Sequence, residues 1–431
     1  MNSVNLIIIL TDCLRWDYFV KMNAYKSASV VFSRSWSPSP STHLSIPSIL
    51  TGAIPFEFSN ETGIRGKSKA LYLPNILYRM NFKVIMITGN VVTSRIFNFM
   101  PIHGIWEDFL PRKKRDIETI SKAPGRRRLE LAIKRGLMRH PRLFYILRGG
   151  YRKLVELAKA IRASAIGIST IKDQNRCFES KIRADQIVNR FAEALNESNH
   201  RPIFAFLHFM DTHTPYGAPW LSQADLRIAE DLANKLYYSP NLLKDTEIKA
   251  LRELYEGEVK YLDTSLQKLF DIIDSRLGFD DTVVFLLSDH GEMLGERGVF
   301  LHPNNVLSNE LLHVPFAIYG EQAKRIKVDP NKLISTIKLH ELAVKLVGTE
   351  GDVTLEEENP PVVSVGYESV TGNIRGPYKP YNMRIKTEES DEYYEFVKNP
   401  EALRYFEQLL MRRRRRYLKY KLTGKLYGVK T

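Results

Sequence analysis

Four short runs of mostly apolar residues, several of them rich in β-branched side chains, constrain the fold of this chain more than any other feature. The runs are residues 4–10, 82–87, 203–209 and 282–287. Strands that are apolar on both faces are typical of a sheet covered by helices on both sides. Apolar residues at helical spacing lie between the runs, over residues 73–80, 180–196 and 247–277. Strands that alternate with helices predict a layered α/β fold.

Composition excludes several other classes of protein. The 431 residues are 44% hydrophobic, which supplies a sizeable core and excludes a chain that is disordered throughout. The chain has only two cysteines, Cys13 and Cys177, so it is neither a disulfide-rich secreted scaffold nor a cysteine-rich zinc module. At about 150 residues per domain the length allows up to three units, and one large domain with insertions fits equally well.

Positive charge is concentrated in two segments. The net charge is +14, yet residues 112–172 alone hold 18 basic and 4 acidic side chains, and residues 412–431 hold nine basic side chains and no acidic one. The remainder of the chain is therefore acidic. In the first segment basic and apolar residues interleave, as in amphipathic helices that lie on anionic surfaces. We predict a main body of residues 1–111 and 173–350, a basic helical insertion at 112–172, a C-terminal subdomain at 351–411 and a basic tail at 412–431.

The sequence also bears on location. No apolar run reaches the roughly 20 residues that span a bilayer, and the run at residues 4–10 lacks the basic flank of a signal peptide. We expect a cytoplasmic protein that could bind the inner membrane face peripherally through its basic segments. An alternative of another class is a membrane-surface or nucleic-acid binding protein with an inactive enzyme body. Nucleic acid is disfavoured because the sequence contains no recognisable nucleic-acid-binding scaffold.

Acidic residues and histidines follow three of the apolar runs. Asp12 follows the first run, Asp211 and His213 follow the third, and Asp289 and His290 follow the fourth. Ligands of open α/β sheets bind at the carboxyl ends of the strands. Carboxylates and imidazoles are suitable ligands for a divalent cation. The sequence therefore predicts a metal site at this edge of the sheet.

Residues 41–52 are rich in hydroxyl side chains and lead into a predicted helix. A hydroxyl near a helix N-terminus lies where the helix dipole and free N–H groups favour an oxyanion. Coordination to a metal would lower the pKa of such a hydroxyl and make it a nucleophile. An ordinary Ser/Thr helix cap explains the same residues without any chemistry.

Taken together, these blocks resemble the sulfatase-like branch of the alkaline phosphatase superfamily. The matching blocks are residues 5–12 with Arg15, residues 42–52, residues 207–216, and residues 288–298 with His302. They occur in the order typical of the family. The resemblance implies a three-layer α/β/α sandwich around a mixed, mostly parallel sheet, together with the basic helical insertion and a small C-terminal element.

The resemblance also implies roles for individual residues. Asp12, Asp289 and His290 match metal ligands, and Thr42 matches the nucleophile, whose oxygen completes the metal shell. His213 and His302 match residues that contact the transferred group and protonate or stabilise the leaving oxygen; the plain alternative is that they cap or pack near loops. Further candidates, for a second metal or for substrate contacts, are His208, Asp211, Arg15 and Ser45, although we expect one divalent ion rather than two.

Departures from the family pattern bear on the substrate and the metal. Type I sulfatases oxidise a Cys or Ser to formylglycine, but Thr42 cannot be converted in this way, so we expect no formylglycine. Cys13 replaces the second Asp of the sulfatase Asp-Asp pair. Losing a hard oxygen ligand while keeping His290 favours Zn or Mn, with Ca or Mg as alternatives.

In this family Thr nucleophiles belong to phosphodiesterases, phosphonate hydrolases and phosphoglycerol-type transferases. The sequence therefore predicts a metal-dependent hydrolase or transferase of phosphate or sulfate esters that forms a covalent intermediate on Thr42. A sulfatase proper is the alternative within the same class. All the expected metal ligands are present in the sequence, which argues against an inactive body.

Overall fold

The computed structural model describes residues 4–61, 63–64, 68–99, 104–109, 181–196, 202–217, 219–356, 362–370 and 377–431. The chain divides into two compact units, one formed by Met1–Phe109 and Lys181–Thr431 and the other by Leu110–Ser180. The second unit lies outside the described residues, and so does the predicted insertion at 112–172. The predicted division into domains therefore stays a prediction.

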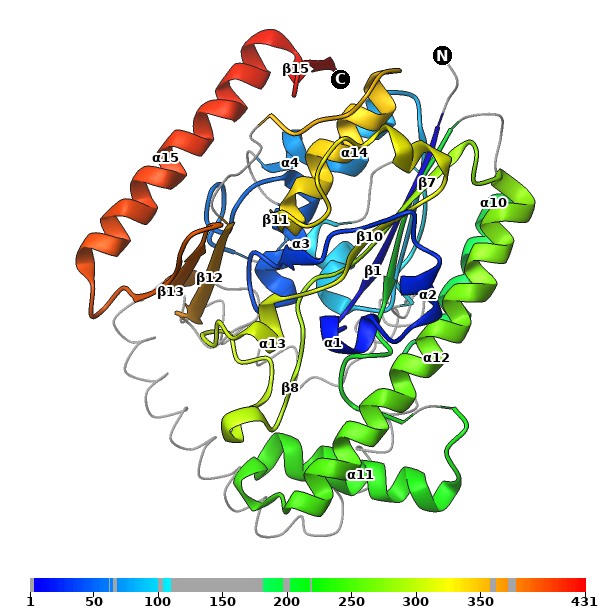
Figure 1. The fold of residues 1–431 in the computed structure, drawn as a ribbon, viewed down its shortest axis with the longest axis vertical. Helices are drawn as coiled ribbons and strands as arrows, with labels where there is room; N and C mark the ends of the chain where they lie inside the picture. Colours follow the sequence, from blue (N-terminus) through cyan, green and yellow to red (C-terminus); the bar gives the residue numbers. More distant parts are fainter. Residues whose placement is uncertain are drawn as a thin grey trace, which may run out of the picture. The chain divides into compact units, whose positions relative to one another are not determined.

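A seven-stranded sheet with the order β2-β10-β7-β1-β6-β4-β5 forms the centre of the first unit (Figure 1). Its strands are β1 (Asn5–Thr11), β2 (Val30–Val31), β4 (Lys83–Thr88), β5 (Ile105–Glu107), β6 (Ile203–Phe209), β7 (Thr282–Ser288) and β10 (Phe316–Tyr319). Neighbours from β7 to β5 pair in parallel, whereas β10 pairs antiparallel with β7 and with β2. The predicted apolar runs form β1, β4, β6 and β7, and the expected mixed, mostly parallel sheet is confirmed.

Helices cover both faces of this sheet. Alternate residues of β1 point to opposite faces: Ile7 and Ile9 pack with α10 and α12, while Leu6 and Ile8 pack with α3, α5 and α14. These helices are α3 (Thr42–Thr51), α5 (Leu73–Arg79), α10 (Ala184–Asn196), α12 (Asp245–Leu277) and α14 (Leu339–Gly348). Burial on both faces explains why the strands are continuous apolar runs rather than alternating ones.

Smaller elements complete this part of the unit. The helices are α1 (Trp16–Phe19), α2 (Asn23–Lys26), α4 (Ser68–Leu71), α11 (Gln223–Tyr238) and α13 (Asn309–Leu312). The short strands are β3 (Arg34–Trp36), β8 (Met293–Leu294), β9 (Phe300–Leu301) and β11 (Leu333–Ser335). The helix expected over residues 180–196 begins only at Ala184, because Lys181 belongs to a non-helical segment that leads into α10.

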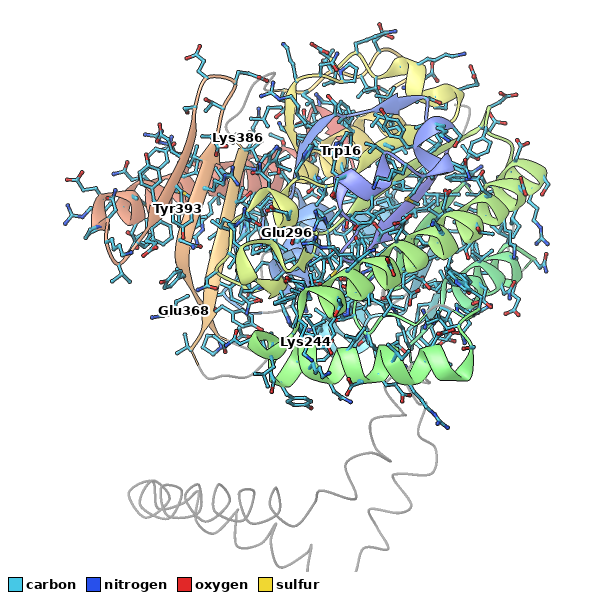
Figure 2. The ribbon with its side chains drawn as sticks, turned by 60° about the horizontal axis from the view of Figure 1, so that its bottom comes forward. Trp16, Lys244, Glu296, Glu368, Lys386 and Tyr393 are labelled. Atoms are coloured by element: carbon cyan, nitrogen blue, oxygen red, sulfur yellow. The ribbon has the colours of Figure 1, made fainter. Side chains whose placement is uncertain are left out.

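The C-terminal part adds a second sheet and a long helix. Strands β12 (Val362–Ser369), β13 (Tyr378–Lys386) and β14 (Asp391–Glu395) are antiparallel, and Figure 2 labels Glu368, Lys386 and Tyr393 on them. Helix α15 (Pro400–Thr423) packs Phe406 and Leu410 into a core with this sheet. The hairpin of β15 (Lys425–Leu426) and β16 (Val429–Lys430) ends the chain.

Helix α15 crosses the boundary expected between residues 411 and 412. Tyr417, beyond that boundary, is buried in the main core, and Arg413 Nε lies 3.2 Å from Glu57 Oε2. An apolar stripe at helical spacing and an ion pair thus join the basic segment to the body, whereas composition alone suggested a tail. Among the described helices, none is long and apolar enough to cross a bilayer.

Candidate active and metal site

The pairing of β1 with β7 brings two predicted metal ligands together. Thr11 lies opposite Ser288 in the parallel register, so the residues that follow, Asp12 and Asp289, are neighbours at the carboxyl edge of the sheet. The backbone N–H of Asp289 donates to the Thr11 carbonyl at 3.2 Å. His290 follows directly in sequence. The strand-end pattern therefore predicted this juxtaposition correctly.

Thr42 approaches the same edge from the N-terminus of α3, where it is the first helical residue. Its Oγ1 donates to Asp289 Oδ2 at 2.7 Å and lies 3.3 Å from Asp12 Oδ2. The same oxygen lies 3.1 Å from His290 Nε2. The hydroxyl therefore lies among the three side chains predicted as metal ligands, at the positive end of a helix dipole.

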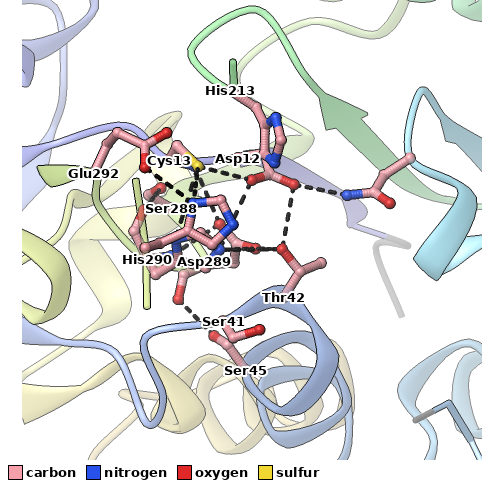
Figure 3. Close-up of polar contacts among 12 residues, drawn as sticks. Asp12, Cys13, Ser41, Thr42, Ser45, His213, Ser288, Asp289, His290 and Glu292 are labelled. Carbon is pink, nitrogen blue, oxygen red and sulfur yellow. Dashed lines mark hydrogen bonds and ion pairs between the residues drawn. The ribbon is translucent and has the colours of Figure 1, made fainter. Parts of the chain in front are cut away.

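Side-chain orientation completes this cluster, which Figure 3 shows. Asp12, Thr42, Asp289 and His290 are all buried. His290 Nδ1 lies 2.8 Å from the Gly291 carbonyl, and this contact assigns the ring proton to Nδ1. His290 Nε2 then directs its lone pair at the carboxylates, 3.5 Å from Asp289 Oδ2 and 3.8 Å from Asp12 Oδ1.

The electrostatics of the cluster suit a divalent cation. Among the described residues, the ion-pair partners of Asp12 and Asp289 are histidines and not lysines or arginines. Burial and the neighbouring Asp12 raise the pKa of Asp289 well above its usual value. Burial lowers the pKa of His290 to about 3, so the ring is neutral and free to coordinate. Two buried carboxylates, a neutral imidazole and a hydroxyl form a donor set that fits such an ion.

Ser45 lies one turn into α3 and holds the helix against the end of β7. Its Oγ donates to the Asp289 carbonyl at 2.6 Å, and Ser37 Oγ donates to the same oxygen. The sequence suggested Ser45 as a candidate for a second metal or a substrate contact. The structure shows it fixing the backbone of Asp289 instead.

His213 and His302 lie together beside this cluster. Their ring centroids are 5.1 Å apart, and the rings of His290 and His302 are 4.6 Å apart. Glu292 Oε1 lies 3.0 Å from His302 Nδ1, while Tyr216 donates to Glu292 Oε2 at 3.1 Å. Burial lowers the pKa of His302, but Glu292 outweighs it, so the net pKa is raised. The two histidines that the sequence placed near the transferred group therefore lie on one side of the site.

His208, on β6, and Asn90, in the loop after β4, contact Asp12 from the side of β1 opposite to β7. His208 Nε2 lies 3.4 Å from Asp12 Oδ2, and Asn90 Nδ2 donates to the same oxygen at 2.8 Å. The structure thus brings His208 to the cluster, as the sequence suggested. Our sequence interpretation missed Asn90, although it lies two residues beyond the end of β4 and the strand-end rule could have found it. Glu292, also missed, lies inside the block at residues 288–298.

Arg15 does not face the cluster. Its guanidinium donates to Asp17 Oδ2 at 2.8 Å, to Glu296 Oε1 at 2.7 Å and to the Glu292 carbonyl at 3.2 Å. These partners take up N–H donors of both terminal nitrogens of the guanidinium group. Arg15 therefore ties the loop after β1 to the loop after β7.

Cys13 lies between Asp12 and the histidine pair. Its φ angle is 66°, and its Sγ donates to Asp12 Oδ1 at 3.1 Å. The ligand atoms of Cys13, His213 and His302 lie within 4.8 Å of one another. A thiol thus stands beside the cluster where the sulfatase pattern has a carboxylate.

Asp211 lies apart from the cluster, in the loop after β6. Its Oδ1 accepts from the Ala184 backbone at the start of α10 at 3.2 Å, and its Oδ2 has no hydrogen-bond partner among the described residues. Burial raises its pKa to about 7; Lys181 opposes this shift and Glu258 adds to it. The structure therefore does not support Asp211 as a second-metal ligand.

Replacing Asp211 by Asn should remove a pH dependence of stability. The pKa of Asp211 is about 7 in the folded protein against 3.8 for the ordinary group. Protonated Asp211 therefore supports folding fully below pH 3.8, and the free energy of unfolding falls as the pH rises towards 7. We expect Asp211→Asn to be more stable than the wild type at pH 8, by up to about 4 kcal/mol, and similar at pH 4. Urea unfolding at both pH values measures this, with the exposed Asp274→Asn as control. An Asp211→Asn protein that is less stable at pH 8 would contradict the assignment.

Comparisons with known proteins agree with this fold. Residues 144–346 match the family model named Sulfatase. Phosphoethanolamine transferase EptA of Helicobacter pylori is 23% identical over 182 residues, which cover 42% of this chain and 32% of that protein. The chain spans less than a third of the length of the curated relatives it matches.

Two solved structures share the fold. Phosphonate monoester hydrolase of Agrobacterium radiobacter superposes with a TM-score of 0.54 at 13% identity and covers 96% of each chain. The periplasmic domain of EptC from Escherichia coli, in complex with Zn, gives a TM-score of 0.52 at 11% identity, with 84% of this chain and 89% of that chain covered.

The fold and the match together define the class. Residues 144–346 resemble the Sulfatase family, and the described residues share the fold of alkaline phosphatase-like sulfatases. The similar proteins bear the names of enzymes that act on ester bonds, such as phosphonate monoester hydrolase and phosphoethanolamine transferase. The resemblance noted in the sequence is thereby confirmed.

Proposed function

We propose that this protein is a metal-dependent hydrolase or transferase of phosphate or sulfate esters with Thr42 as its nucleophile. The observation that carries the proposal is the position of Thr42 Oγ1, which lies 2.7 Å from Asp289 Oδ2, 3.1 Å from His290 Nε2 and 3.3 Å from Asp12 Oδ2. A plain helix cap does not need three ligand side chains around its hydroxyl. The Thr42 hydroxyl instead donates to the carboxylate of Asp289, which follows β7 at the edge of the sheet.

Asp12, Thr42, Asp289 and His290 would hold one divalent cation. Bound there, the cation would lower the pKa of the Thr42 hydroxyl and offset negative charge on the transferred group. Zn is favoured, with Mn next, because the donor set contains an imidazole and because the similar EptC domain is described in complex with Zn. Since a Thr cannot become formylglycine, we expect no such modification.

The residues of the chain then divide the reaction between them. Deprotonated Thr42 Oγ1 attacks phosphorus or sulfur, the bond to the leaving oxygen breaks, and the group becomes an ester of Thr42. His302, held by Glu292 at 3.0 Å, donates a proton to the leaving oxygen, and His213 orients that oxygen beside it. Water or an acceptor alcohol then takes the group from Thr42.

Phosphate esters are the favoured substrates, and a sulfatase proper is the alternative. The relatives bear names of both kinds, phosphoethanolamine transferase and choline-sulfatase. The absence of a convertible Cys or Ser at position 42 favours the phosphate side. An inactive body that only binds other molecules is disfavoured because the four proposed ligands lie together at one edge of the sheet.

A screen of ester substrates tests the proposal directly. The metal-free protein is loaded with Zn, Mn, Mg or Ca and assayed with aryl phosphate monoesters, phosphodiesters, phosphonates and sulfates. We expect phosphodiester or phosphonate turnover with Zn or Mn and little with Ca. Sulfatase activity without any turnover of phosphorus esters would overturn the phosphate preference, and no turnover of any ester with any ion would overturn the enzyme proposal.

Binding to an anionic membrane surface, and a cytoplasmic location, stay predictions. Residues 112–172 lie outside the described part of the chain. In the second basic segment, Leu418 and Leu422 are exposed on α15 beside Arg415 and Lys419. These outward side chains, and not Arg413 with its Glu57 partner, are the ones that could contact such a surface.

A further inference from the structure

Lys181 is a buried lysine whose ammonium group holds three backbone carbonyls of one loop. Its Nζ donates to the carbonyls of Asp211 and His213 at 2.7 Å each and to that of Pro215 at 2.9 Å. Only 5% of the side chain is exposed. A lysine ammonium has three N–H donors, so all three are spent on this loop.

This loop carries two side chains that reach the proposed site. His213 projects to within 5.1 Å of the His302 ring, measured between centroids. Tyr216 donates to Glu292, which in turn holds His302. The path of the backbone between residues 211 and 216 therefore sets the positions of both histidines. His213 Nδ1 lies 2.6 Å from the Thr214 carbonyl, so the ring orientation also follows the local backbone.

A buried counter-charge supports Lys181 in this place. Glu258 on α12 lies 3.6 Å from Lys181 Nζ and accepts two hydrogen bonds from Arg183 at 2.8 Å each. Glu258 also accepts from the backbone N–H of Gly217 at 2.6 Å. Lys181, Arg183 and Glu258 thus form hydrogen bonds to both ends of the loop from 211 to 217. A charged donor bound to several carbonyls orders a loop more strongly than neutral hydrogen bonds do.

We infer that Lys181 is a positioning residue: its buried ammonium fixes the loop that places His213, and through Tyr216 and Glu292 also His302, beside the leaving oxygen. This inference rests on the proposed function and adds a residue that lies in none of the matched sequence blocks. Among the described residues, Lys181 contacts the three loop carbonyls, Glu258 and the Tyr216 ring, and none of the four proposed metal ligands. Its contribution passes through the loop.

The test compares leaving groups of different basicity. Lys181→Met removes the ammonium but keeps the length of the side chain. When protonation of the leaving oxygen is impaired, esters of phenol should lose more kcat than esters of p-nitrophenol, whose oxygen needs no proton to leave. We expect the phenol ester to lose at least about 10-fold more than the p-nitrophenol ester. Metal content should match that of the wild type, because no metal ligand is on this loop.

A second readout is independent of activity. Hydrogen exchange should accelerate in Lys181→Met over residues 211–217 and stay unchanged in β1 and β7. Lys235→Met, at an ion pair with Asp231 and Glu247 on the surface, is the matched control and should resemble the wild type in both readouts. Lys181→Gln, which retains two N–H donors, should be intermediate between Lys181→Met and the wild type.

Several outcomes would overturn the inference. These are equal losses for both leaving groups, exchange that accelerates throughout the body, and failure of both variants to fold, since that would make Lys181 part of the general fold. Failure of the proposed function itself looks different, because the wild type would then turn over neither ester. The exchange experiment still reports on the loop in that case.

Discussion

Replacing Thr42 by alanine is expected to reduce ester turnover by at least about 10³-fold, since removing a nucleophile removes the covalent route. The hydroxyl oxygen is the atom that faces Asp12, Asp289 and His290 at 2.7 to 3.3 Å. Folding should survive, because Ser41 and not Thr42 occupies the cap position of α3. The loss should therefore be in kcat and not in the amount of folded protein.

Two further variants make this experiment specific. Thr42→Ser keeps a hydroxyl and should retain part of the activity. Thr51→Ala removes a hydroxyl from the far end of the same helix, where it bonds to the Pro47 carbonyl at 2.6 Å, and should be close to the wild type. Turnover of aryl phosphodiesters and the metal content of each protein are the measurements. Undiminished turnover by Thr42→Ala would remove this residue from the mechanism.

Replacing Asp289 by Asn is expected to have opposite effects on the metal-bound and the metal-free protein. Losing one carboxylate ligand should weaken Zn binding by at least about 100-fold and abolish turnover, because even changes to residues behind metal ligands cost 10- to 100-fold. In the metal-free protein, Asp289 and Asp12 are buried together, and burial and Asp12 raise the pKa of Asp289. A carboxyl whose pKa is raised by folding costs stability at pH values above its ordinary pKa. The amide cannot ionise and removes this cost, so the metal-free variant should melt at a higher temperature than the metal-free wild type.

Thermal unfolding with and without a chelator, together with Zn titration, measures both effects. Asp281→Asn is the matched control, because Asp281 is exposed and lies immediately before the same strand, β7. The control should bind Zn and melt like the wild type in both states. If Asp289→Asn binds Zn as tightly as the wild type, Asp289 is no ligand; if its metal-free form is less stable, the charge assignment is wrong.

Much of the fold and part of the site followed from the sequence alone. The runs that form β1, β4, β6 and β7 are apolar on both faces, and only a sheet covered by helices on both sides buries such strands. Because parallel strands end at one edge, residues that follow them converge there. Asp12, Asp289 and His290 could therefore be placed together from their positions directly after β1 and β7. Local pattern and strand geometry were sufficient for these three residues.

The contacts that hold this site in place were decided only by the tertiary structure. The sequence suggested Arg15 and Ser45 as candidate site residues. In the structure Arg15 binds Glu296 and Ser45 binds the Asp289 carbonyl, and both partners are far away in the sequence. Helix α15 is likewise anchored by contacts far away in the sequence, such as that of Arg413 with Glu57. Lys181 follows no strand and lies in no motif, and its role depends on carbonyls about thirty residues away that have no side-chain signature. Backbone acceptors are the same at every residue, so only the folded path of the chain decides which of them a buried cation binds.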